Sequence, residues 1–246
     1  MIYLAHTAHW QFLGLVTGIV AWILTMAAVG LNEWRLWQVD GVPVIASGEA
    51  WVGIWRACFH SHAFPAAEQC RAIGLSDAFA PPEIPAAQVL MMLALVCGLA
   101  GNVSAGAAVR MAYFSLENRG NVRLAFVLAG ALYLLTAALS LVPLAWNMNS
   151  VLNNSTIDFP PEFHFPAAPV RQRVGSAIGV GIFASLLMLI SGNLFLCYWC
   201  AWKGPEQTKD PLHGPWTVTT LPQNWDLARG ESQGRDNPTF HSQEIS

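Results

Sequence analysis

Two cysteines, Cys58 and Cys70, lie in a connection between two uncharged apolar stretches of this 246-residue chain. Trp34 precedes them, and the run Gly53-Ile54-Trp55 lies just before the first cysteine. A disulfide between two thiols at this spacing closes a loop of about a dozen residues, which stabilises a fold by roughly 3 kcal/mol in the chain-entropy model. Disulfides persist outside the cytosol, so these residues predict a cross-linked extracellular module mounted on membrane helices. We expect function in this module and its neighbours.

Four apolar segments are long enough to hold such a module on a membrane. They cover residues 10–31, 86–109, 124–146 and 174–202, and none of them contains Asp, Glu, Lys or Arg. Each reaches the roughly 20 residues that a helix needs to cross a hydrocarbon core of about 30 Å, in which an ionised side chain is costly. A composition of 54% hydrophobic and 11% charged residues favours membrane spans over the alternative, a soluble domain with buried helices.

The orientation of the spans follows from the short connection at residues 110–123. It carries three basic residues and one acid (Arg110, Arg119, Arg123 and Glu117), which places it in the cytoplasm by the positive-inside tendency. Residues 10–31 are interpreted as a retained helix rather than a signal peptide, because no basic region precedes them and the apolar run is long. Both termini are then cytoplasmic, and residues 32–85 and 147–173 form two outer loops.

The first outer loop has the composition of β-strands. Residues 34–45 are rich in Trp, Val and Ile, with a turn expected at Asp40-Gly41, and a second strand is predicted over residues 50–59. The two-residue period of a strand puts Trp51, Gly53 and Trp55 on one face, with Gly53 as a gap that another backbone can approach. In the second outer loop, the prolines of Asp158-Phe159-Pro160-Pro161 predict a short edge strand that ends there.

These residues resemble the claudins and their PMP22-type relatives. Trp34 lies 19 positions before Gly53, and Gly53-Ile54-Trp55 followed by Cys58 and Cys70 is similar to the W…GLW…C…C signature of that superfamily, with Ile54 in place of the usual Leu. Further similarities occur at residues 11–14, 85–87, 158–159 and 174–177, so the resemblance covers residues 8–202.

The resemblance implies a left-handed four-helix bundle that bears a small extracellular antiparallel β-sheet made from both outer loops. By analogy, the fold of the sheet depends on Trp34, Gly53, Ile54, Trp55, Cys58 and Cys70. The implied function is structural cell–cell adhesion at tight junctions of the plasma membrane, through polymerisation with itself and other claudins in cis and trans. The Trp rings suit a site between lipid headgroups and water, although Trp37 and Trp51 lie outside the signature and have an aromatic belt as an alternative interpretation.

A second class of function shares the same signature. Auxiliary subunits of ion channels or receptors, such as the calcium-channel gamma proteins, also resemble this chain. The pair Asp158-Phe159 beside prolines is closer to the claudin form of the second outer loop, and it favours the junctional interpretation.

The charges of the outer loops bear on ion permeation. Residues 32–85 contain six acids and three arginines, and fixed charge along a narrow pore concentrates counter-ions. If a pore forms, we expect a weak cation preference with Asp40 and Glu68 as lining residues. The alternative is that these charges lie on solvated strand faces without a pore.

Two departures from the family pattern limit the comparison. Gln88 stands where most claudins place an Arg at the outer start of the second helix, so an ionic contact is expected to be missing there. The chain ends Gln243-Glu244-Ile245-Ser246, and a terminal Ser does not fill the apolar pocket of a PDZ domain, which makes scaffold binding by this route doubtful.

Several residues suggest modification rather than catalysis. Cys197 and Cys200 form a CxxC without the second pair of a zinc site, so S-palmitoylation is preferred to metal or redox chemistry. Asn153 and Asn154 begin overlapping glycosylation sequons, which closeness to the membrane can leave unmodified. His60 and His62 could bind a metal jointly, but two imidazoles without a nearby carboxylate are more often bystanders.

Other function classes find no support in the chain. No nucleophile with a base, metal cluster or phosphate loop is evident, and the spans lack the ionisable residues typical of pumps. A net charge of −3 without an extended basic surface argues against nucleic-acid binding. We therefore expect a non-enzymatic protein without a cofactor, in contact with the lipid bilayer. Its tetraspan domain covers residues 1–202, and the polar residues 203–246 predict a disordered cytoplasmic tail.

Overall fold

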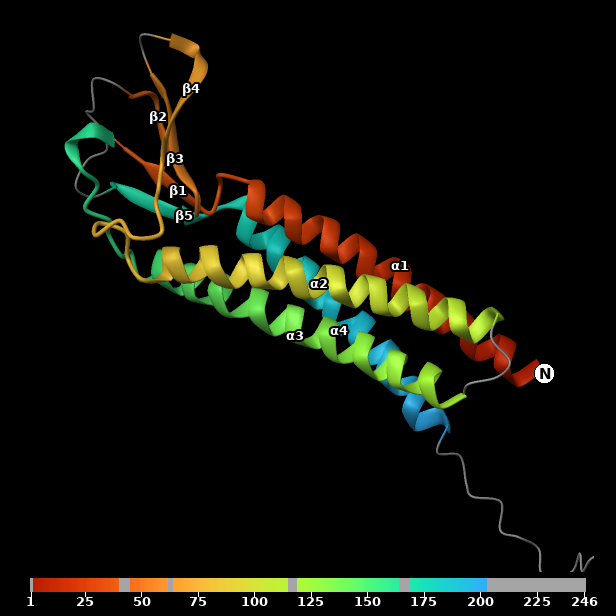
Figure 1. The fold of residues 1–246 in the computed structure, drawn as a ribbon. Coiled ribbons are helices and arrows are strands. Elements are labelled where there is room, and N and C mark those ends of the chain that lie inside the picture. The colour runs from red at the N-terminus through yellow and green to blue at the C-terminus, as the bar shows by residue number, and fades with distance from the viewer. Residues whose placement is uncertain (1, 40–44, 62–63, 115–118, 164–168, 203–246) are drawn as a thin grey trace, which may run out of the picture. The chain divides into compact units, whose positions relative to one another are not determined.

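The computed structural model describes residues 2–39, 45–61, 64–114, 119–163 and 169–202. Four long helices run side by side: α1 (Ile2–Gly30), α2 (Glu83–Phe114), α3 (Arg119–Leu152) and α4 (Ser176–Trp202) (Figure 1). Each contains a segment that is long and apolar enough to cross a membrane. The prediction of four spanning helices is confirmed, because the apolar side chains that cover the outside of these helices need lipid rather than water around them.

Small residues let the helices approach one another closely. A Cβ atom at Gly18 of α1 would lie 2.6 Å from the ring of Tyr133 in α3, and one at Gly101 of α2 would lie 3.2 Å from the same ring. Further along α3, a Cβ at Gly130 would lie 3.0 Å from the carbonyl oxygen of Gly192 in α4. Without a hydrophobic force between helices in lipid, such close packing is what holds a bundle together.

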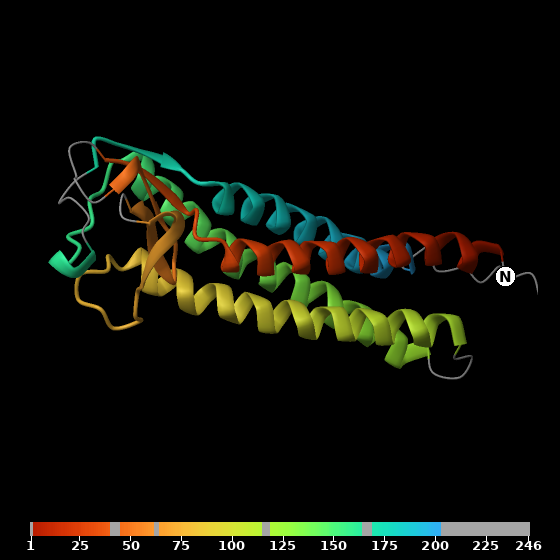
Figure 2. The same ribbon diagram turned by 90° about the horizontal axis from the view of Figure 1, so that it is seen from above.

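A five-stranded sheet lies at one end of the bundle (Figures 1 and 2). Its strands are β1 (Arg35–Gln38), β2 (Ile45–Val52), β3 (Arg56–Ser61), β4 (Phe64–Ala72) and β5 (Arg171–Val174), in the order β4-β3-β2-β1-β5. Every neighbouring pair is antiparallel. Four strands come from the first outer loop and β5 comes from the second, so the predicted sheet built from both loops is confirmed.

The prediction of one strand over residues 50–59 was wrong. Residues 53–55 form the turn of a hairpin between β2 and β3, in which the Gly53 amide donates to the Arg56 carbonyl over 2.9 Å. Trp51 and Trp55 therefore do not share a face of one strand. The expected close approach at Gly53 is present, however, because a Cβ there would lie 2.9 Å from the Cα atom of Asn32.

The edge strand of the second outer loop is also not where the prolines suggested. Residues 158–160 are in no strand, and a short 3₁₀ helix follows at Pro161–Phe163. The edge strand is β5, which pairs with β1 through Gln172 opposite Trp37. Two successive prolines offer no amide hydrogens for a ladder, and the pairing begins only after the chain has left them behind.

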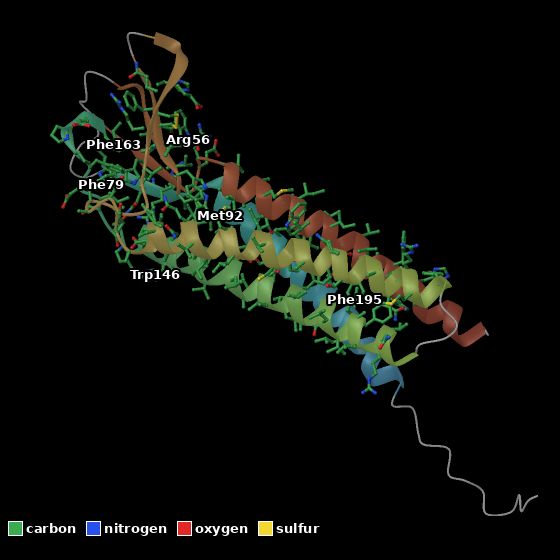
Figure 3. The ribbon with its side chains drawn as sticks, in the orientation of Figure 1. Arg56, Phe79, Met92, Trp146, Phe163 and Phe195 are labelled. Carbon is green, nitrogen blue, oxygen red and sulfur yellow. A yellow bond between two sulfur atoms is a disulfide. The ribbon has the colours of Figure 1, made fainter. Side chains whose placement is uncertain are left out.

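The inner face of the sheet is covered by aromatic side chains from both outer loops. Trp37 is fully buried, and its ring meets that of Phe159 edge to face with 5.4 Å between centroids. Phe79 and Phe163 pack in the same cluster, with 5.2 Å between their centroids, and both lie at the sheet end of the molecule, whereas Phe195 lies among the helices (Figure 3). Trp37 is thus a core residue of the sheet, and its alternative interpretation as an aromatic-belt residue is wrong.

Candidate functional site

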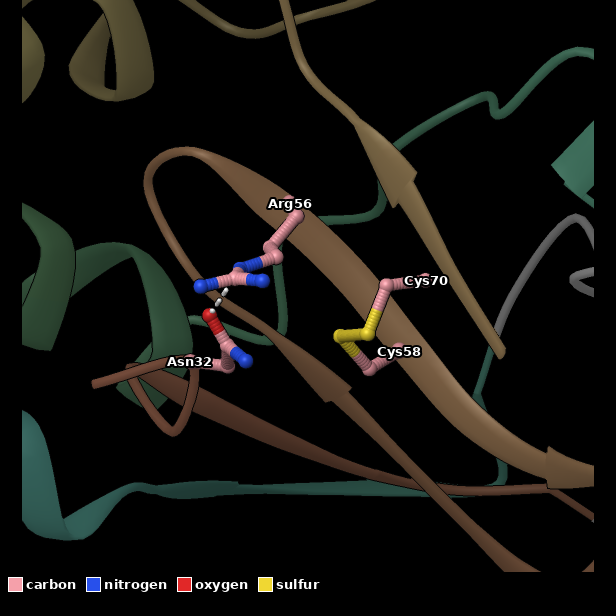
Figure 4. Close-up of a disulfide and its surroundings, with 4 residues drawn as sticks. All are labelled: Asn32, Arg56, Cys58 and Cys70. Carbon is pink, nitrogen blue, oxygen red and sulfur yellow. Dashed lines mark hydrogen bonds between the residues drawn. A yellow bond between two sulfur atoms is a disulfide. The ribbon is translucent and has the colours of Figure 1, made fainter. Parts of the chain in front are cut away.

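The candidate site is the sheet face that points away from the aromatic cluster. Cys58 of β3 and Cys70 of β4 lie opposite each other in the ladder and form a disulfide on this face (Figure 4). It closes a loop with a sequence separation of 12, and it ties the free edge strand β4 to its neighbour β3. The sheet can keep this shape with one face open, because the cross-link limits the unfolded states of the hairpin.

Glu68 lies beside the disulfide. It faces His60 across the β3–β4 ladder, and its carboxylate is within 4.8 Å of the sulfurs of Cys58 and Cys70. These three residues do not form a metal site, since sulfurs joined to each other offer no thiolate. The His60 ring instead packs edge to face on Trp51, 5.0 Å away. The argument that no carboxylate lies near His60 was wrong, whereas His62 falls outside the described residues.

The signature residues Trp34 and Ile54 connect the sheet to the bundle. Both are 1% exposed, and both belong to an apolar cluster with residues of all four helices: Ala28, Val29, Ala87, Met91, Leu144, Ala177 and Ile178. The Trp34 indole donates a hydrogen bond to the Ala28 carbonyl over 3.0 Å. Trp34 is therefore buried in protein rather than placed at the headgroups. Trp55, at 37% exposed, is the signature indole that reaches the surface.

A buried polar cluster lies at the same junction. Arg35 of β1 donates from Nη2 to Glu83 Oε1 at the start of α2 over 3.0 Å and to Asn147 Oδ1 of α3 over 2.9 Å. Ser150 of α3 donates to the same Glu83 oxygen over 2.6 Å. The Arg35 side chain is 0% exposed, and burial lowers its pKa, while the hydrogen bond and negative charge of Glu83 act in the opposite direction. The cluster ties one strand to two helices.

Gln88 takes over the position where an arginine was expected. Its side chain is buried and donates to the carbonyl oxygens of Ile54, over 2.6 Å, and Ile73, over 3.0 Å. An amide therefore fixes the hairpin turn and the end of the first outer loop to α2. Gln88 makes no ionic contact, and the ion pair that joins the sheet to α2 is that of Arg35 and Glu83.

Close backbone contacts complete the attachment of the sheet. Gly175, between β5 and α4, has no room for a side chain because a Cβ there would overlap the carbonyl group of Glu33. Its amide donates to the Trp34 carbonyl over 2.9 Å. At the β2–β3 turn, Arg56 donates from Nε to the Asn32 side chain over 2.9 Å (Figure 4). The segment after α1 is thus held between β5 and the hairpin turn.

The open face of the sheet carries charge of both signs. It has Glu68 on the free edge strand β4, and the strand pairing places Arg171 and Arg173 of β5 on the same face at the opposite edge. Glu49 of β2 is exposed on this face too, opposite Gln38 of β1, which in turn lies opposite Arg171. Three of the six acids counted in the first loop do not lie free on this face: Glu83 is buried, Glu33 accepts from Ser176 over 2.6 Å, and Asp77 accepts from the Gly74 amide over 2.7 Å. Asp40 lies outside the described residues.

The predicted modification sites lie at the ends of the helices. Asn153 and Asn154 are exposed just after α3, and Asn154 has a left-handed backbone with φ of 52°. Such a residue is common where a helix ends, and asparagine tolerates it. Cys197 is exposed near the end of α4, whereas the side chain of Cys200 lies outside the described part of the chain. Both modifications stay predictions.

The chain matches a known protein family over most of its length. The family model described as "PMP-22/EMP/MP20/Claudin tight junction" matches residues 19–197. This chain belongs to that family. It is 28% identical to claudin-2 of Bos taurus over 201 residues, which cover 79% of the chain and 80% of the relative. It is 26% identical to claudin-3 of Homo sapiens over 189 residues, which cover 76% of the chain and 80% of the relative.

Membership of the claudin family agrees with the fold described above. The match includes α2 and α3, the second part of α1, most of α4 and all five strands of the sheet, so the disulfide and the polar junction both lie within it. The family indicates a multi-pass membrane protein with a claudin-like role at tight junctions. It points to a structural, non-enzymatic protein that associates with claudins.

Proposed function

We propose that this protein is an adhesion component of tight junctions, which polymerises into strands and seals or gates the space between cells. The observation that carries the proposal is the disulfide-linked sheet at one end of the four spans, with one face packed on aromatic residues and the other open. A surface of this kind can meet the same surface on a neighbouring cell without first becoming ordered, so association costs little conformational entropy.

The attachment of the sheet supports this role. Strand β1 is joined to α2 and α3 by Arg35, and the hairpin turn is joined to α2 by Gln88. Because these contacts are buried, the sheet cannot swing freely on its helices. Because the orientation of the sheet is fixed, copies that associate side by side in one membrane present their sheets in the same direction to the neighbouring cell. A continuous seal between two cells requires such an alignment.

The proposed partners and topology follow from the family. Partners are further copies of this chain and other claudins, in cis and in trans, and the names of two relatives, claudin-2 and claudin-3, support this. The tetraspan domain covers residues 1–202, with both termini in the cytoplasm as the arginines near residues 110–123 indicate. Cys197 and Cys200 are proposed palmitoylation sites, and Asn153 and Asn154 proposed glycosylation sites.

Permeation depends on where the charges lie rather than on their number. Glu68 is exposed beside the disulfide, near the free edge β4, whereas Arg171 and Arg173 lie at the β5 edge. We propose a weak cation preference for a pore formed at the β4 side of the sheet, with Glu68 as a lining residue. Asp40, the other proposed lining residue, lies outside the described residues. A pore formed at the β5 side would favour anions, because its nearest fixed charges are positive.

The direct test is expression in an epithelial monolayer whose own claudins have been deleted. If the proposal is right, the full chain raises transepithelial resistance or changes the ratio of sodium to chloride permeability. The double variant Cys58→Ser/Cys70→Ser, delivered to the surface in equal amount, has no such effect. Unchanged resistance and permeability with the full chain at the cell contacts contradicts the proposal. Altered gating of a coexpressed channel by the same chain would favour the auxiliary-subunit alternative.

A further inference from the structure

The lipid-facing side of α4 carries a regular stripe of side chains. Its exposed positions lie alternately four and three residues apart, at Gly179, Phe183, Leu186, Ile190, Asn193 and Cys197. A spacing of this kind keeps one seam of a helix in line with a partner helix that crosses it at a shallow angle. Every span has an exposed apolar side, however, so the spacing alone does not select α4.

The amide of Asn193 is what distinguishes this stripe. Its Nδ2 donates to the Leu189 carbonyl of the same helix over 2.8 Å, and the side chain is exposed. The amides of Asn102 and Asn147 are instead tied into the bundle, by Tyr133 of α3 over 2.8 Å and by Arg35 over 2.9 Å. Asn193 Oδ1 and its second amide hydrogen have no such neighbour in another helix of the described bundle. In hydrocarbon, a polar group without a hydrogen bond costs free energy, so a hydrogen-bond partner from another molecule would stabilise these two groups.

Asn193 lies well inside the apolar part of the spans. Its neighbour Gly192 packs against Gly130 of α3, where a Cβ would lie 3.0 Å from the Gly192 carbonyl. Arg123, at the inner end of the apolar run of α3, is seven residues before Gly130, which corresponds to about 10 Å along a helix. The Asn193 amide is therefore too deep in the membrane to reach the lipid headgroups, and water is not available to it as a hydrogen-bond partner.

A second copy of this chain supplies a matching group at the right depth. Copies in one membrane have the same orientation, so a two-fold axis along the membrane normal brings identical residues together at equal depth. A carboxamide has both a donor and an acceptor, so two Asn193 side chains can hydrogen-bond to each other. A single polar residue within an apolar seam is also the device that fixes register and partner number in helix pairs.

We propose that two copies associate in the membrane through their α4 stripes, with Asn193 of each copy hydrogen-bonded to Asn193 of the other. This contact is made by the spans and does not require the outer sheet, so it is independent of adhesion between cells. Gly179, where a Cβ would meet nothing within 4 Å, leaves room for the helices to approach at the outer end of the stripe.

Cross-linking of the full chain in native membranes tests the contact. In a background with Cys97→Ser, Cys197→Ser and Cys200→Ser, the variant Ile190→Cys places a thiol on the stripe one turn from Asn193. The matched control is Val103→Cys on the lipid side of α2, which is 66% exposed where Ile190 is 52% exposed. The two positions lie at similar depth, because Gly101 packs on Tyr133 one turn from Gly130. Oxidation with copper phenanthroline should give a disulfide dimer of the chain for Ile190→Cys and much less for Val103→Cys.

Substitution of the asparagine then separates the amide from the apolar stripe. Hydrogen bonds between spans contribute about 0.6–2 kcal/mol, so Asn193→Leu should lower the yield of Ile190→Cys dimer by about 3- to 30-fold. Asn193→Gln keeps both a donor and an acceptor and should retain most of the dimer. Surface amount and the Cys58–Cys70 disulfide, measured in each variant, serve as the control for folding.

Three results would overturn the proposal. One is equal cross-linking at positions 103 and 190, which would indicate random collision. Another is a dimer yield that Asn193→Leu leaves unchanged. The third is a product with the mass of a different membrane protein, which would mean that another partner covers the stripe. Because the cells used can be single cells without junctions, loss of this contact and loss of adhesion are measured separately.

Discussion

Arg35 of β1 and Glu83 of α2 form an ion pair 3.0 Å long that is almost completely buried, although 48 residues separate them in the chain. The pair lies where the sheet meets the bundle, with Asn147 and Ser150 of α3 as further partners. The pair thus joins the sheet, which lies in water, to the helix bundle, which lies in lipid, so that the two move as one rigid unit.

Removal of one partner of this pair should be costly. Arg35→Met leaves the Glu83 carboxylate buried without its cationic partner, and loss of one member of a buried pair costs about 3–5 kcal/mol. Thermal unfolding of the protein in nanodiscs should show a markedly lower midpoint. The double variant Arg35→Met/Glu83→Leu removes both charges and should recover much of the loss. A double variant as unstable as the sum of the two single variants would show that the two side chains are not coupled.

The disulfide should stabilise the sheet rather than the spans. We expect Cys58→Ser/Cys70→Ser to lower the stability of the sheet by about 3 kcal/mol, since the loop between the cysteines is no longer closed. Proteolysis of the outer loops in intact cells measures this, with helix content by circular dichroism as the reference. The control is Cys97→Ser, which changes a free, half-buried cysteine of α2 and should leave proteolysis unaltered. Equal protease resistance of the double variant and the native protein would be inconsistent with this role.

Gly175 should tolerate no side chain. Gly175→Ala puts a methyl group into the carbonyl of Glu33 at the β5–α4 junction, and overpacking of this kind costs about 1–3 kcal/mol. Gly106→Ala in α2, where a Cβ meets nothing within 4 Å, should instead be neutral or stabilising by about 0.5–1 kcal/mol, because glycine weakens a helix. In the same detergent, the unfolding midpoint of Gly175→Ala should therefore fall, while that of Gly106→Ala stays equal to the native value or rises. A midpoint for Gly175→Ala equal to that of Gly106→Ala would contradict the close approach.

Gln88 should be required for the hairpin turn. Gln88→Met has a similar volume but no donor, which leaves the buried carbonyls of Ile54 and Ile73 without the amide at a cost of about 1–3 kcal/mol. Hydrogen exchange should increase at residues 53–56 and 73 and remain unchanged in α4. If exchange rises equally throughout the chain, or not at all, Gln88 does not act as a local anchor.

Glu68 should affect permeation without affecting the fold. In a monolayer that expresses the protein, Glu68→Gln should lower the permeability ratio of sodium to chloride, because it removes a negative charge from the β4 side of the open face. The matched variant Arg171→Gln, at the other edge, should change the ratio less if the pore lies at β4. A ratio that responds to Arg171→Gln and not to Glu68→Gln would place the pore at β5.

The four spans and the disulfide-linked sheet could be predicted because both depend on local properties of the sequence. Uncharged apolar runs of sufficient length have few alternatives to membrane helices, and Cys58 and Cys70 stand close enough in the chain to be paired in adjacent strands. The hairpin at Gly53 was missed because a glycine inside a strand and a glycine in a turn have the same local signal, and only the pairing of β2 with β3 distinguishes them.

The polar junction was missed although the sequence contained part of its signal. Arg35 and Trp37 are two residues apart in β1, so the period of the strand places Arg35 on the same inner face as the buried Trp37. An arginine on that face needs a buried acid. The acid that pairs with Arg35 could not be predicted from the sequence. Glu83 is one of six acidic residues in the loop, and its approach to β1 depends on the packing of α2 and α3 against the sheet.

Adhesion between cells through the disulfide-linked sheet can be tested with two populations of cells that form no junctions of their own, each expressing the chain with a differently coloured label. Both colours should concentrate where two expressing cells touch, and neither should concentrate where an expressing cell touches a non-expressing one. Cys58→Ser/Cys70→Ser should abolish the enrichment at equal surface amount. Uniform surface distribution of both colours at contacts between expressing cells would contradict adhesion through the sheet.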